Sequence, residues 1–417
     1  MRILFSTWPA HGHLLPLLPL ARAAERAGHS VVIASGAEGV LEASRRGLST
    51  WEVGPSRAAS DAAFRADGPD LGSLPPDGRM AAAISGMFGA AAFGRAADLV
   101  PRAEVWKPDL VVHSITELAG AVAAARVGAR HVVHGLGPLP PESWTWFGAR
   151  FGDLCASWGV PDLVEHILDV PYLDTCPPSL QSDAVEDFRN RRPLRPSSGE
   201  VLPGDRLPWD ADVLASLPLD RTVHLTLGTL FHGATNVFLD ALAGMRELHV
   251  NVAVTVGPGS DVDRLGPQPP NVVVADFAPH ALLLPHCAAL VTQGGAGTIL
   301  AALCHGLPHL ILPQGADQFR NAETAERAGV ALVLEPSEAT PGAIARAMAR
   351  LLDESTFADA CGVAQSQIDS MPDADAVLAE LLDTAVPAIR PVRRTVDRAG
   401  SAPGPSHRRR RPAAHAG

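Results

Sequence analysis

Two histidines follow a short apolar run at the start of this 417-residue chain. The run covers residues 2–6, and the loop behind it reads Trp8-Pro-Ala-His-Gly-His-Leu-Leu-Pro16. An imidazole ionises near neutral pH, so a histidine at the start of a helix suits a general base that takes a proton from a hydroxyl group. The competing interpretation is a pair of structural or solvent-exposed histidines in a turn.

Three later segments carry groups suited to a phosphorylated sugar. Val291-Thr-Gln-Gly-Gly-Ala-Gly-Thr298 offers backbone N–H groups and a helix N-terminus to phosphate, although it matches neither a Walker loop nor a dinucleotide-binding motif. The alternative interpretation of this segment is a tight strand–helix turn that binds no phosphate. Pro313-Gln-Gly-Ala-Asp-Gln-Phe-Arg-Asn321 places Asp317 and Gln318 where they suit sugar hydroxyls, but Asp317 also suits a helix N-cap. Leu227-Gly-Thr229 suits a second phosphate.

Alternating strands and helices must position these segments. We expect strands at 2–6, 30–34, 109–113, 131–134, 222–227, 249–256, 272–275, 289–292 and 309–312. We expect helices at 17–27, 78–99, 117–127, 234–246, 279–285, 297–304, 317–328, 341–352, 356–369 and 374–385. The pattern predicts an α/β fold of two Rossmann-like domains that face a central cleft, separated by the Pro- and Gly-rich stretch 189–220.

Five segments follow from this pattern. We expect an N-terminal domain at 1–205, a linker at 206–221, a C-terminal domain at 222–373, a helix at 374–389 that packs back toward the N-terminal domain, and a disordered Arg- and Pro-rich tail at 390–417.

Composition excludes several classes of protein. The 34 Lys and Arg against 45 Asp and Glu give a net charge of -11, which argues against nucleic acid as a partner. Five widely spaced cysteines without a CxxC pair favour neither a disulfide framework nor a zinc site. No apolar run approaches the ~20 residues of a membrane span. We therefore expect a cytoplasmic protein without stable membrane insertion; a homodimer is compatible with the sequence.

A resemblance to glycosyltransferase family 1 rests on four motifs taken in order. These are His11-Gly-His-Leu-Leu-Pro-Leu, Thr226-Leu-Gly-Thr, Gly294-Gly-Ala-Gly-Thr and Pro313-Gln-Gly-Ala-Asp-Gln-Phe. The match is to bacterial antibiotic glycosyltransferases of the macrolide, glycopeptide and enediyne type, over about residues 1–385. It implies a GT-B fold, a nucleoside diphosphate sugar held by the C-terminal domain, a hydrophobic aglycone held by the N-terminal domain, and no cofactor or metal.

The resemblance also assigns site residues. His13, rather than His11, becomes the catalytic base. The donor-binding positions are Gly228, Thr229, Phe277, Ala278, Gln293, Gly294, Gly295, Gly297, Thr298, Asp317, Gln318 and Asn321.

The chain departs from the family pattern at two positions. Gln293 stands where the family usually has histidine, so stabilisation of the leaving group depends more on backbone amides. Ser114 stands where the family usually has the aspartate that orients the base. Three options stay open: the carboxylate is missing, it is Glu117, or it comes from elsewhere in the chain.

Apolar side chains in the first half are candidates for the acceptor site. They are Met80, Met87, Phe88, Trp144 and Phe147, for which a place in the core is the alternative. The predicted function is an inverting transfer of a sugar or deoxysugar to a natural-product hydroxyl. The resemblance to antibiotic glycosyltransferases, together with a composition typical of a GC-rich genome, implies TDP rather than UDP as the donor nucleotide. A nucleotide-sugar epimerase of the same fold and a non-catalytic auxiliary partner are the alternatives.

Overall fold

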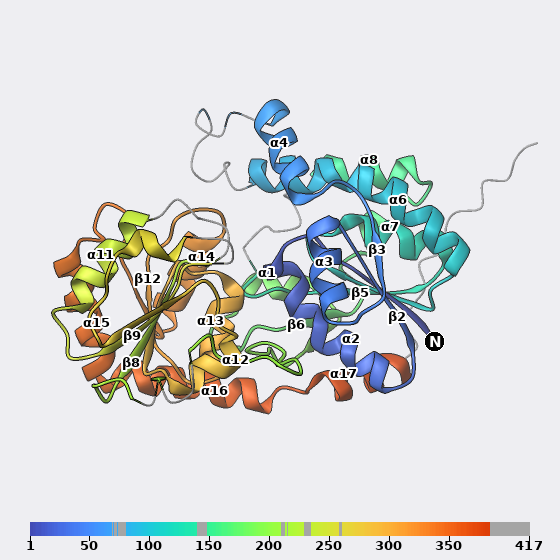
Figure 1. Cartoon of the computed structure of the whole chain (residues 1–417). Helices are drawn as coiled ribbons and strands as arrows, with labels where there is room; N and C mark the ends of the chain where they lie inside the picture. Colours follow the sequence, from blue (N-terminus) through green and yellow to red (C-terminus); the bar gives the residue numbers. More distant parts are fainter. Residues whose placement is uncertain are drawn as a thin grey trace, which may run out of the picture.

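Two parallel β-sheets organise the chain (Figure 1). The computed structural model describes residues 1–68, 70, 73, 81–139, 148–209, 213–214, 216–228, 235–257 and 261–383. The first sheet contains β1 (Arg2–Ser6), β2 (Ser30–Ser35), β3 (Thr50–Glu52), β4 (Leu110–Ser114), β5 (Arg130–His134), β6 (Tyr172–Asp174) and β7 (Arg191–Pro193). The second contains β8 (Thr222–Thr226), β9 (Asn251–Thr255), β10 (Val272–Ala275), β11 (Ala289–Thr292), β12 (His309–Ile311) and β13 (Ala331–Val333).

Helices cover both faces of each sheet. Those around the first sheet are α1 (His11–Leu14), η1 (Leu15–Leu17), α2 (Leu18–Arg26), α3 (Ala37–Arg45), α4 (Arg57–Asp67), η3 (Ser85–Gly89), α6 (Ala90–Trp106), α7 (Leu118–Val127), α8 (Gly148–Ser157), α9 (Leu163–His166) and η4 (Asp183–Asp187). Those that follow β8 are α11 (Thr235–Met245), η5 (Val262–Leu265), α12 (His280–Leu283), η6 (Leu284–His286), α13 (Ala296–Leu303), α14 (Gln318–Arg327), α15 (Pro341–Asp353), α16 (Ser355–Ser370) and α17 (Ala374–Asp383).

Both sheets have the strand order of a Rossmann fold. The first runs β3-β2-β1-β4-β5-β6-β7 and the second β10-β9-β8-β11-β12-β13. In each, the strand order reverses beside the first strand, between β1 and β4 and between β8 and β11. Ligands of such sheets bind at the carboxyl ends of the strands at this reversal point. The predicted fold class, a GT-B-like pair of Rossmann domains, is confirmed.

The central strands are apolar and buried on both faces. Leu110, Val111 and Val112 of β4 and Val132 and Val133 of β5 have no exposed side-chain surface. A parallel strand between two helix layers needs such a continuous apolar run, and this is the signal that made these strands predictable.

The last described helix returns to the first sheet. Helix α17, drawn in red beside α2 in Figure 1, buries Val377, Leu378 and Leu381 in the core around α2. Arg26 of α2 pairs with Asp375 at 2.7 Å. The chain therefore crosses from the second sheet to the first along α16 and α17.

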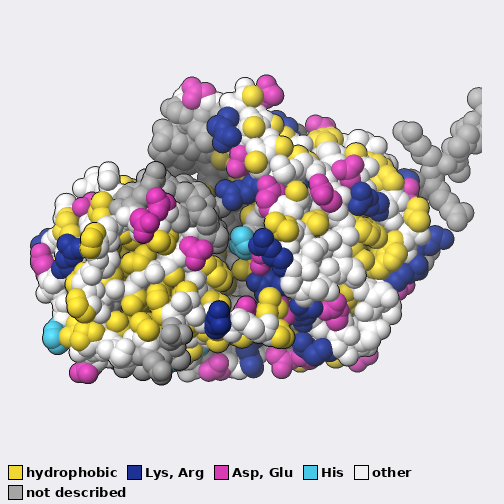
Figure 2. All heavy atoms as spheres, in the orientation of Figure 1, with side chains coloured by type: hydrophobic (Ala, Val, Ile, Leu, Met, Phe, Trp, Pro, Cys, Tyr) yellow, Lys and Arg dark blue, Asp and Glu magenta, His cyan; other side chains and the backbone are white. Residues whose placement is uncertain are grey.

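The two halves of the chain also meet at the carboxyl edges of their sheets. A Cβ on Gly137, in the loop after β5, would lie 2.7 Å from the Cβ of Ala296 at the start of α13. Cys176 and Leu180 pack with Ile299 and Leu303 of α13. Figure 2 shows the surface hollowed where the halves meet. Among the helices that the structure describes, none is long and apolar enough to cross a membrane.

Candidate active site

Loops after two neighbouring strands bring together a histidine and a threonine. β1 and β4 pair in parallel with Ser6 opposite His113, so the loops that follow them leave the sheet at the same edge. His13 lies on the one-turn helix α1, and Thr116 lies in the turn after β4. The Thr116 Oγ1 atom is 3.0 Å from Nδ1 of His13. A hydrogen bond to Nδ1 leaves Nε2 as the ring nitrogen that is free for chemistry.

Neither sequence candidate for the orienting group contacts this imidazole. The Glu117 side chain, 1% exposed, accepts a hydrogen bond from Nε of Arg95 at 2.5 Å. Ser114 ends β4 with its hydroxyl buried and without a hydrogen-bond partner in the structure. The option that Glu117 orients the base is therefore corrected: its carboxylate pairs with Arg95, because an unpaired carboxylate at this depth would be strongly unfavourable.

The buried Arg95 connects this ion pair to the histidine loop. Its Nη2 donates to the carbonyl of Thr7 at 2.8 Å, and its Nη1 donates to the carbonyl of Val53 at 3.1 Å. The Thr7 hydroxyl in turn donates to the carbonyl of His13 at 2.9 Å. Arg95 and Glu117 thus fix the backbone under His13 rather than its ring.

The surroundings of His13 disfavour its protonated form. Partial burial and the positive charges of Arg57 and Arg95 lower the pKa of His13 to about 4. Arg57 begins α4 and lines a cavity of about 370 Å³ beside the histidine loop, together with His11 and Leu14. At pH 7 the imidazole is neutral, as a general base must be.

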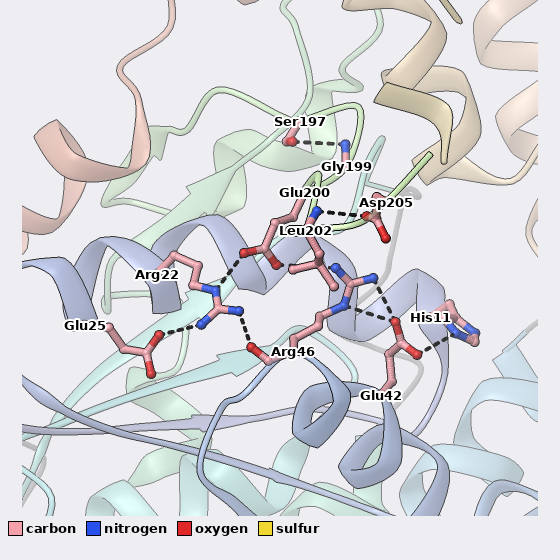
Figure 3. A network of polar contacts seen from close by, with 10 residues as sticks. All are labelled: His11, Arg22, Glu25, Glu42, Arg46, Ser197, Gly199, Glu200, Leu202 and Asp205. Atoms are coloured by element: carbon pink, nitrogen blue, oxygen red, sulfur yellow. Dashed lines mark hydrogen bonds and ion pairs between the residues drawn. The ribbon is translucent and has the colours of Figure 1, made fainter. Parts of the chain in front are cut away.

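The other histidine of the motif points into a surface network (Figure 3). His11 Nε2 lies 3.7 Å from Oε2 of Glu42 on α3. Glu42 also pairs with Arg46, which reaches Glu200 in the stretch between the two sheets. These contacts direct His11 away from Thr116 and leave His13 as the candidate base.

A π-helical turn places an aromatic ring next to His13. Phe88 belongs to η3, and its ring centroid lies 5.6 Å from that of His13 and 4.7 Å from that of Trp8. Single π-helical turns are frequent at functional sites. Met87 precedes Phe88 and is half-buried. The other acceptor candidates, Met80, Trp144 and Phe147, lie outside the described residues.

The equivalent strands of the second sheet present the phosphate-binding candidates. β8 and β11 are paired, so Gly228 and Gln293 follow strands that end side by side. A Cβ at Gly228, which has φ of +72°, would lie 2.1 Å from Nε2 of Gln293. The glycine therefore makes room for the Gln293 side chain, whose Oε1 accepts from Thr292 at 3.0 Å. Thr229 lies outside the described residues.

The glycines after β11 open directly into a helix. Gly295 caps α13, and Gly297 and Thr298 occupy its first turn with exposed and half-exposed surfaces. The cap has no side-chain hydrogen bond, and the N–H of Thr298 donates to the carbonyl of Gly295 at 3.0 Å, so the N–H groups that precede it are left without a side-chain partner. Free N–H groups and the helix dipole favour an anion here.

The loop after β12 is tied to the glycine loop. Asn321 donates through Nδ2 to the carbonyl of Gly294 and to Oδ2 of Asp317, both at 3.0 Å. Oε1 of Gln318 accepts from the N–H groups of Gln314 and Gly315 at 2.8 and 3.1 Å. Asp317 occupies the N-cap position of α14 without a side-chain capping bond and is exposed. Although the residue is exposed overall, burial of its carboxyl group raises the pKa of Asp317, and one carboxylate oxygen is held by Asn321. Gln318 shapes the loop that carries it.

The remaining donor candidates lie at the end of β10. Phe277 is 51% exposed and Ala278 is buried at 2%. An exposed aromatic ring at the carboxyl edge of a sheet suits stacking on a planar base. Within the described residues, no group of three or more His, Cys, Asp or Glu side chains is placed to hold a metal ion.

Three residues of the site were not found from the sequence. Thr116 has an unremarkable hydroxyl in a loop, and Arg57 and Arg95 lie on helical stretches that precede β4 in the chain. Of the three, only Arg95 could have been found from the sequence, because an arginine among the apolar residues of a helix face needs a buried partner.

Comparisons with known proteins agree with this geometry. A family profile described as "Erythromycin biosynthesis protein CIII-like, C-terminal domain" matches residues 237–383. The chain is 32% identical to the elloramycin glycosyltransferase ElmGT of Streptomyces olivaceus over 408 residues, which cover 92% of this chain and 97% of that protein. It is 28% identical to the aclacinomycin-T 2-deoxy-L-fucose transferase of Streptomyces galilaeus over 429 residues, 89% of this chain and 93% of the relative.

A solved structure shares the same arrangement. The glycosyltransferase VinC in complex with DTDP superposes with a TM-score of 0.73 at 29% sequence identity, over 92% of this chain and 98% of that one. The similarity spans both sheets and the strands that carry the candidate site.

Proposed function

The chain belongs to the bacterial natural-product glycosyltransferases of GT-B fold, and on this premise we propose that it transfers a deoxysugar from a TDP-sugar to a hydroxyl of a hydrophobic acceptor, with inversion at the sugar carbon. The protein is a glycosyltransferase; its donor and acceptor are the proposal. The observation that carries the proposal is that His13, whose pKa is lowered to about 4, follows the carboxyl end of β1, while the glycine loop that opens into α13 follows the carboxyl end of β11.

His13 acts as the general base in this mechanism. Its Nε2 takes the proton of the acceptor hydroxyl while the hydroxyl oxygen attacks the anomeric carbon. The bond from that carbon to the diphosphate oxygen breaks, and its electron pair leaves with TDP. Attack opposite the leaving group inverts the anomeric centre. The hydrogen bond between Nδ1 and Thr116 supports this role, because it sets which ring nitrogen faces the acceptor.

The second sheet supplies the donor site. The first turn of α13 stabilises charge that develops on the leaving diphosphate, with the amide of Gln293 beside it. Asp317 holds hydroxyl groups of the sugar, and Phe277 stacks on the base. Because a glutamine carries no charge, the backbone N–H groups of Gly295 and Gly297 contribute most of this stabilisation.

The choice of TDP rests on the relatives. The similar VinC structure is a complex with DTDP, and one relative is a 2-deoxy-L-fucose transferase. The proposed domain limits are 1–205 for the acceptor domain and 222–373 for the donor domain, with the α17 segment docked on the former.

Product analysis tests the proposal. The protein is incubated with TDP-sugars and a hydrophobic acceptor, and the glycoside is analysed by NMR for its anomeric configuration. We expect a glycoside of inverted configuration and release of TDP, with UDP-sugars used at least ten times less efficiently. Retention of configuration, or epimerised nucleotide sugar without transfer, would contradict the proposed reaction; the names of the relatives do not favour the epimerase alternative.

A further inference from the structure

We propose that the acceptor hydroxyl taken by this site is an acidic one, a phenol or an enol of a flat aromatic molecule, rather than an aliphatic alcohol. This inference names the acceptor class of the proposed transferase and rests on that proposed function. Three features of the first half of the chain support this inference. They are the uncharged partner of His13, the surroundings that disfavour protonation of His13, and the aromatic ring next to His13.

The partner of the base is a neutral hydroxyl. Nδ1 of His13 meets Oγ1 of Thr116 at 3.0 Å, and the one carboxylate in this turn, Glu117, is engaged by Arg95. When an imidazole takes up a proton, a carboxylate on its far nitrogen stabilises the charge, as in a Ser-His-Asp triad. A threonine hydroxyl accepts a hydrogen bond but brings no negative charge, so His13 is poorly equipped to become an imidazolium.

The surroundings of the ring make His13 a weak base. Burial is the main cause that lowers its pKa to about 4, and the charges of Arg57 on α4 and Arg95 on α6 act in the same direction. Both arginines are themselves paired with carboxylates, Arg57 with Asp61 at 3.6 Å and Arg95 with Glu117. The site therefore gives little stabilisation to a proton on the histidine.

A base of this kind favours acceptors whose hydroxyl group is acidic. A phenol ionises near pH ~10, as the tyrosine side chain does, and an aliphatic alcohol is several units less acidic. Proton transfer to a weak base is efficient only when the donor is itself acidic. A phenol therefore gives up its proton to a base as weak as His13 more readily than an aliphatic alcohol does.

The neighbouring surface fits a flat ring. Phe88 packs edge-on against Trp8 at 4.7 Å and lies 5.6 Å from the His13 ring. Aromatic rings prefer such offset and edge contacts with other aromatic rings. A planar acceptor placed against Phe88 brings a ring-attached hydroxyl toward Nε2 of His13.

A matched pair of acceptors tests the inference. We would measure kcat/KM for 2-naphthol and for 2-naphthylmethanol, which carry the same rings but a phenolic and an aliphatic hydroxyl, with TDP-glucose, TDP-L-rhamnose and TDP-2-deoxyglucose as donors. The site is expected to prefer 2-naphthol by about 100-fold or more. Equal or faster transfer to 2-naphthylmethanol overturns the inference and leaves the glycosyltransferase function intact. No glycoside from either acceptor with any donor counts against the proposed function, and the inference falls with it.

A substitution at Thr116 tests the cause. Thr116→Asp places a carboxylate on His13, and we expect it to lower the preference for 2-naphthol over 2-naphthylmethanol by about 10-fold, while the matched neutral variant Thr116→Asn keeps the preference. The ratio is measured within one preparation, so partial misfolding does not affect it. An unchanged ratio in Thr116→Asp, or an equal drop in Thr116→Asn, contradicts the role given to the missing charge.

Discussion

At the scale of single residues, the site differs from the family pattern in the partner of its base. A hydroxyl on Nδ1 orients the imidazole as a carboxylate would, but it adds no charge to the ring. Thr116 is therefore a positioning residue: it acts on the substrate only through His13. Its contribution is orientation and choice of tautomer rather than basicity.

Removing this hydroxyl gives the first prediction. Thr116→Val keeps the shape of the side chain but frees the ring, so we expect kcat to fall about 10- to 100-fold, with the KM for the TDP-sugar unchanged. Thr116→Ser keeps a hydroxyl and should retain most of the activity. Steady-state kinetics on both variants provide the measurement. A Thr116→Val enzyme with normal kcat, or a Thr116→Ser enzyme as slow as Thr116→Val, would show that the contact has no catalytic role.

Arg57 gives the second prediction, which concerns pH. A positive charge beside His13 lowers its pKa, so Arg57→Gln should raise that pKa. The base is active when neutral, so the acidic limb of kcat/KM against pH moves to higher pH, by about half a unit or more. Arg65→Gln on the exposed side of the same helix is the control and should leave the limb in place. A shift to lower pH, or none, would contradict the electrostatic description.

The family resemblance assigned the base to His13, but nothing in the sequence pointed to Thr116, because a threonine in a loop is common. Which of Ser114, Thr116 or Glu117 reaches the ring depends on a few side-chain rotamers. It also depends on Arg95, which comes from a different helix and takes the carboxylate. The sequence alone carries little information about which of these side chains reaches the His13 ring.

At the scale of elements, the donor site depends on two loops that are held together by one amide. Asn321 sits in the first turn of α14 and bonds both Gly294 and Asp317. A second feature of this segment is Ala316, whose φ of +55° lies in the left-handed region that ordinary side chains avoid. Strain of this kind persists when neighbouring contacts enforce it, and it is often found at binding sites.

Asn321→Ala tests this coupling. Without the amide the two loops separate, so the KM for the TDP-sugar should rise about 10-fold or more, with a smaller change in kcat. Two lost hydrogen bonds of about 1 kcal/mol each correspond to that range. Glu323→Ala, an exposed position on the same helix, is the matched control. Isothermal titration with TDP and steady-state kinetics provide the measurement; unchanged affinity would show that the loops are held by other contacts.

The sequence predicted the buried central strands but not the shortest ones. Buried central strands such as β1 and β4 carry apolar runs that stand out in the sequence. Four short strands were not predicted: β3, β6, β7 and β13, each of three residues. In β3 and β7, side chains such as Glu52 and Arg191 leave no apolar run, and the strand exists only because a neighbour supplies its hydrogen bonds. Pairing with a neighbouring strand, rather than the local sequence, therefore determines these strands.

At the scale of the whole molecule, buried histidines link stability to pH. His113 and His131 stack between β4 and β5 with their Nε2 atoms 2.6 Å apart, and both are buried. Burial lowers the pKa of His113, His134 and His309 to about 4. In the unfolded chain each would titrate near 6.5. Between pH 6.5 and 4 the unfolded state binds more protons, so stability falls as the pH drops through this range.

Acid sensitivity is therefore the fourth prediction. Each such histidine contributes up to about 2 kcal/mol of lost stability at pH 5 relative to pH 7.5. We expect Tm to fall by about 10 °C or more over that range, measured by differential scanning calorimetry. His309→Leu should flatten the dependence, because it removes one buried titrating group. A Tm that stays constant from pH 7.5 to 5 would contradict the assignment of neutral, buried imidazoles.

The architecture itself was predictable because both halves repeat one pattern. Alternating strands and helices on either side of a Pro- and Gly-rich stretch sufficed to predict two Rossmann-like sheets, and the similarity to VinC agrees with that fold. The way the halves meet was not predictable. Gly137 against Ala296 and α17 on α2 are contacts between segments far apart in sequence.

The central claim is that His13 takes the acceptor proton while the second sheet holds the donor. The most direct test measures turnover and TDP affinity side by side in His13→Ala. The base assignment predicts a loss of about 100-fold or more in kcat with an acceptor that is un-ionised at the assay pH, with TDP affinity unchanged. Near-normal turnover with intact TDP binding would contradict the assignment of His13 as the base.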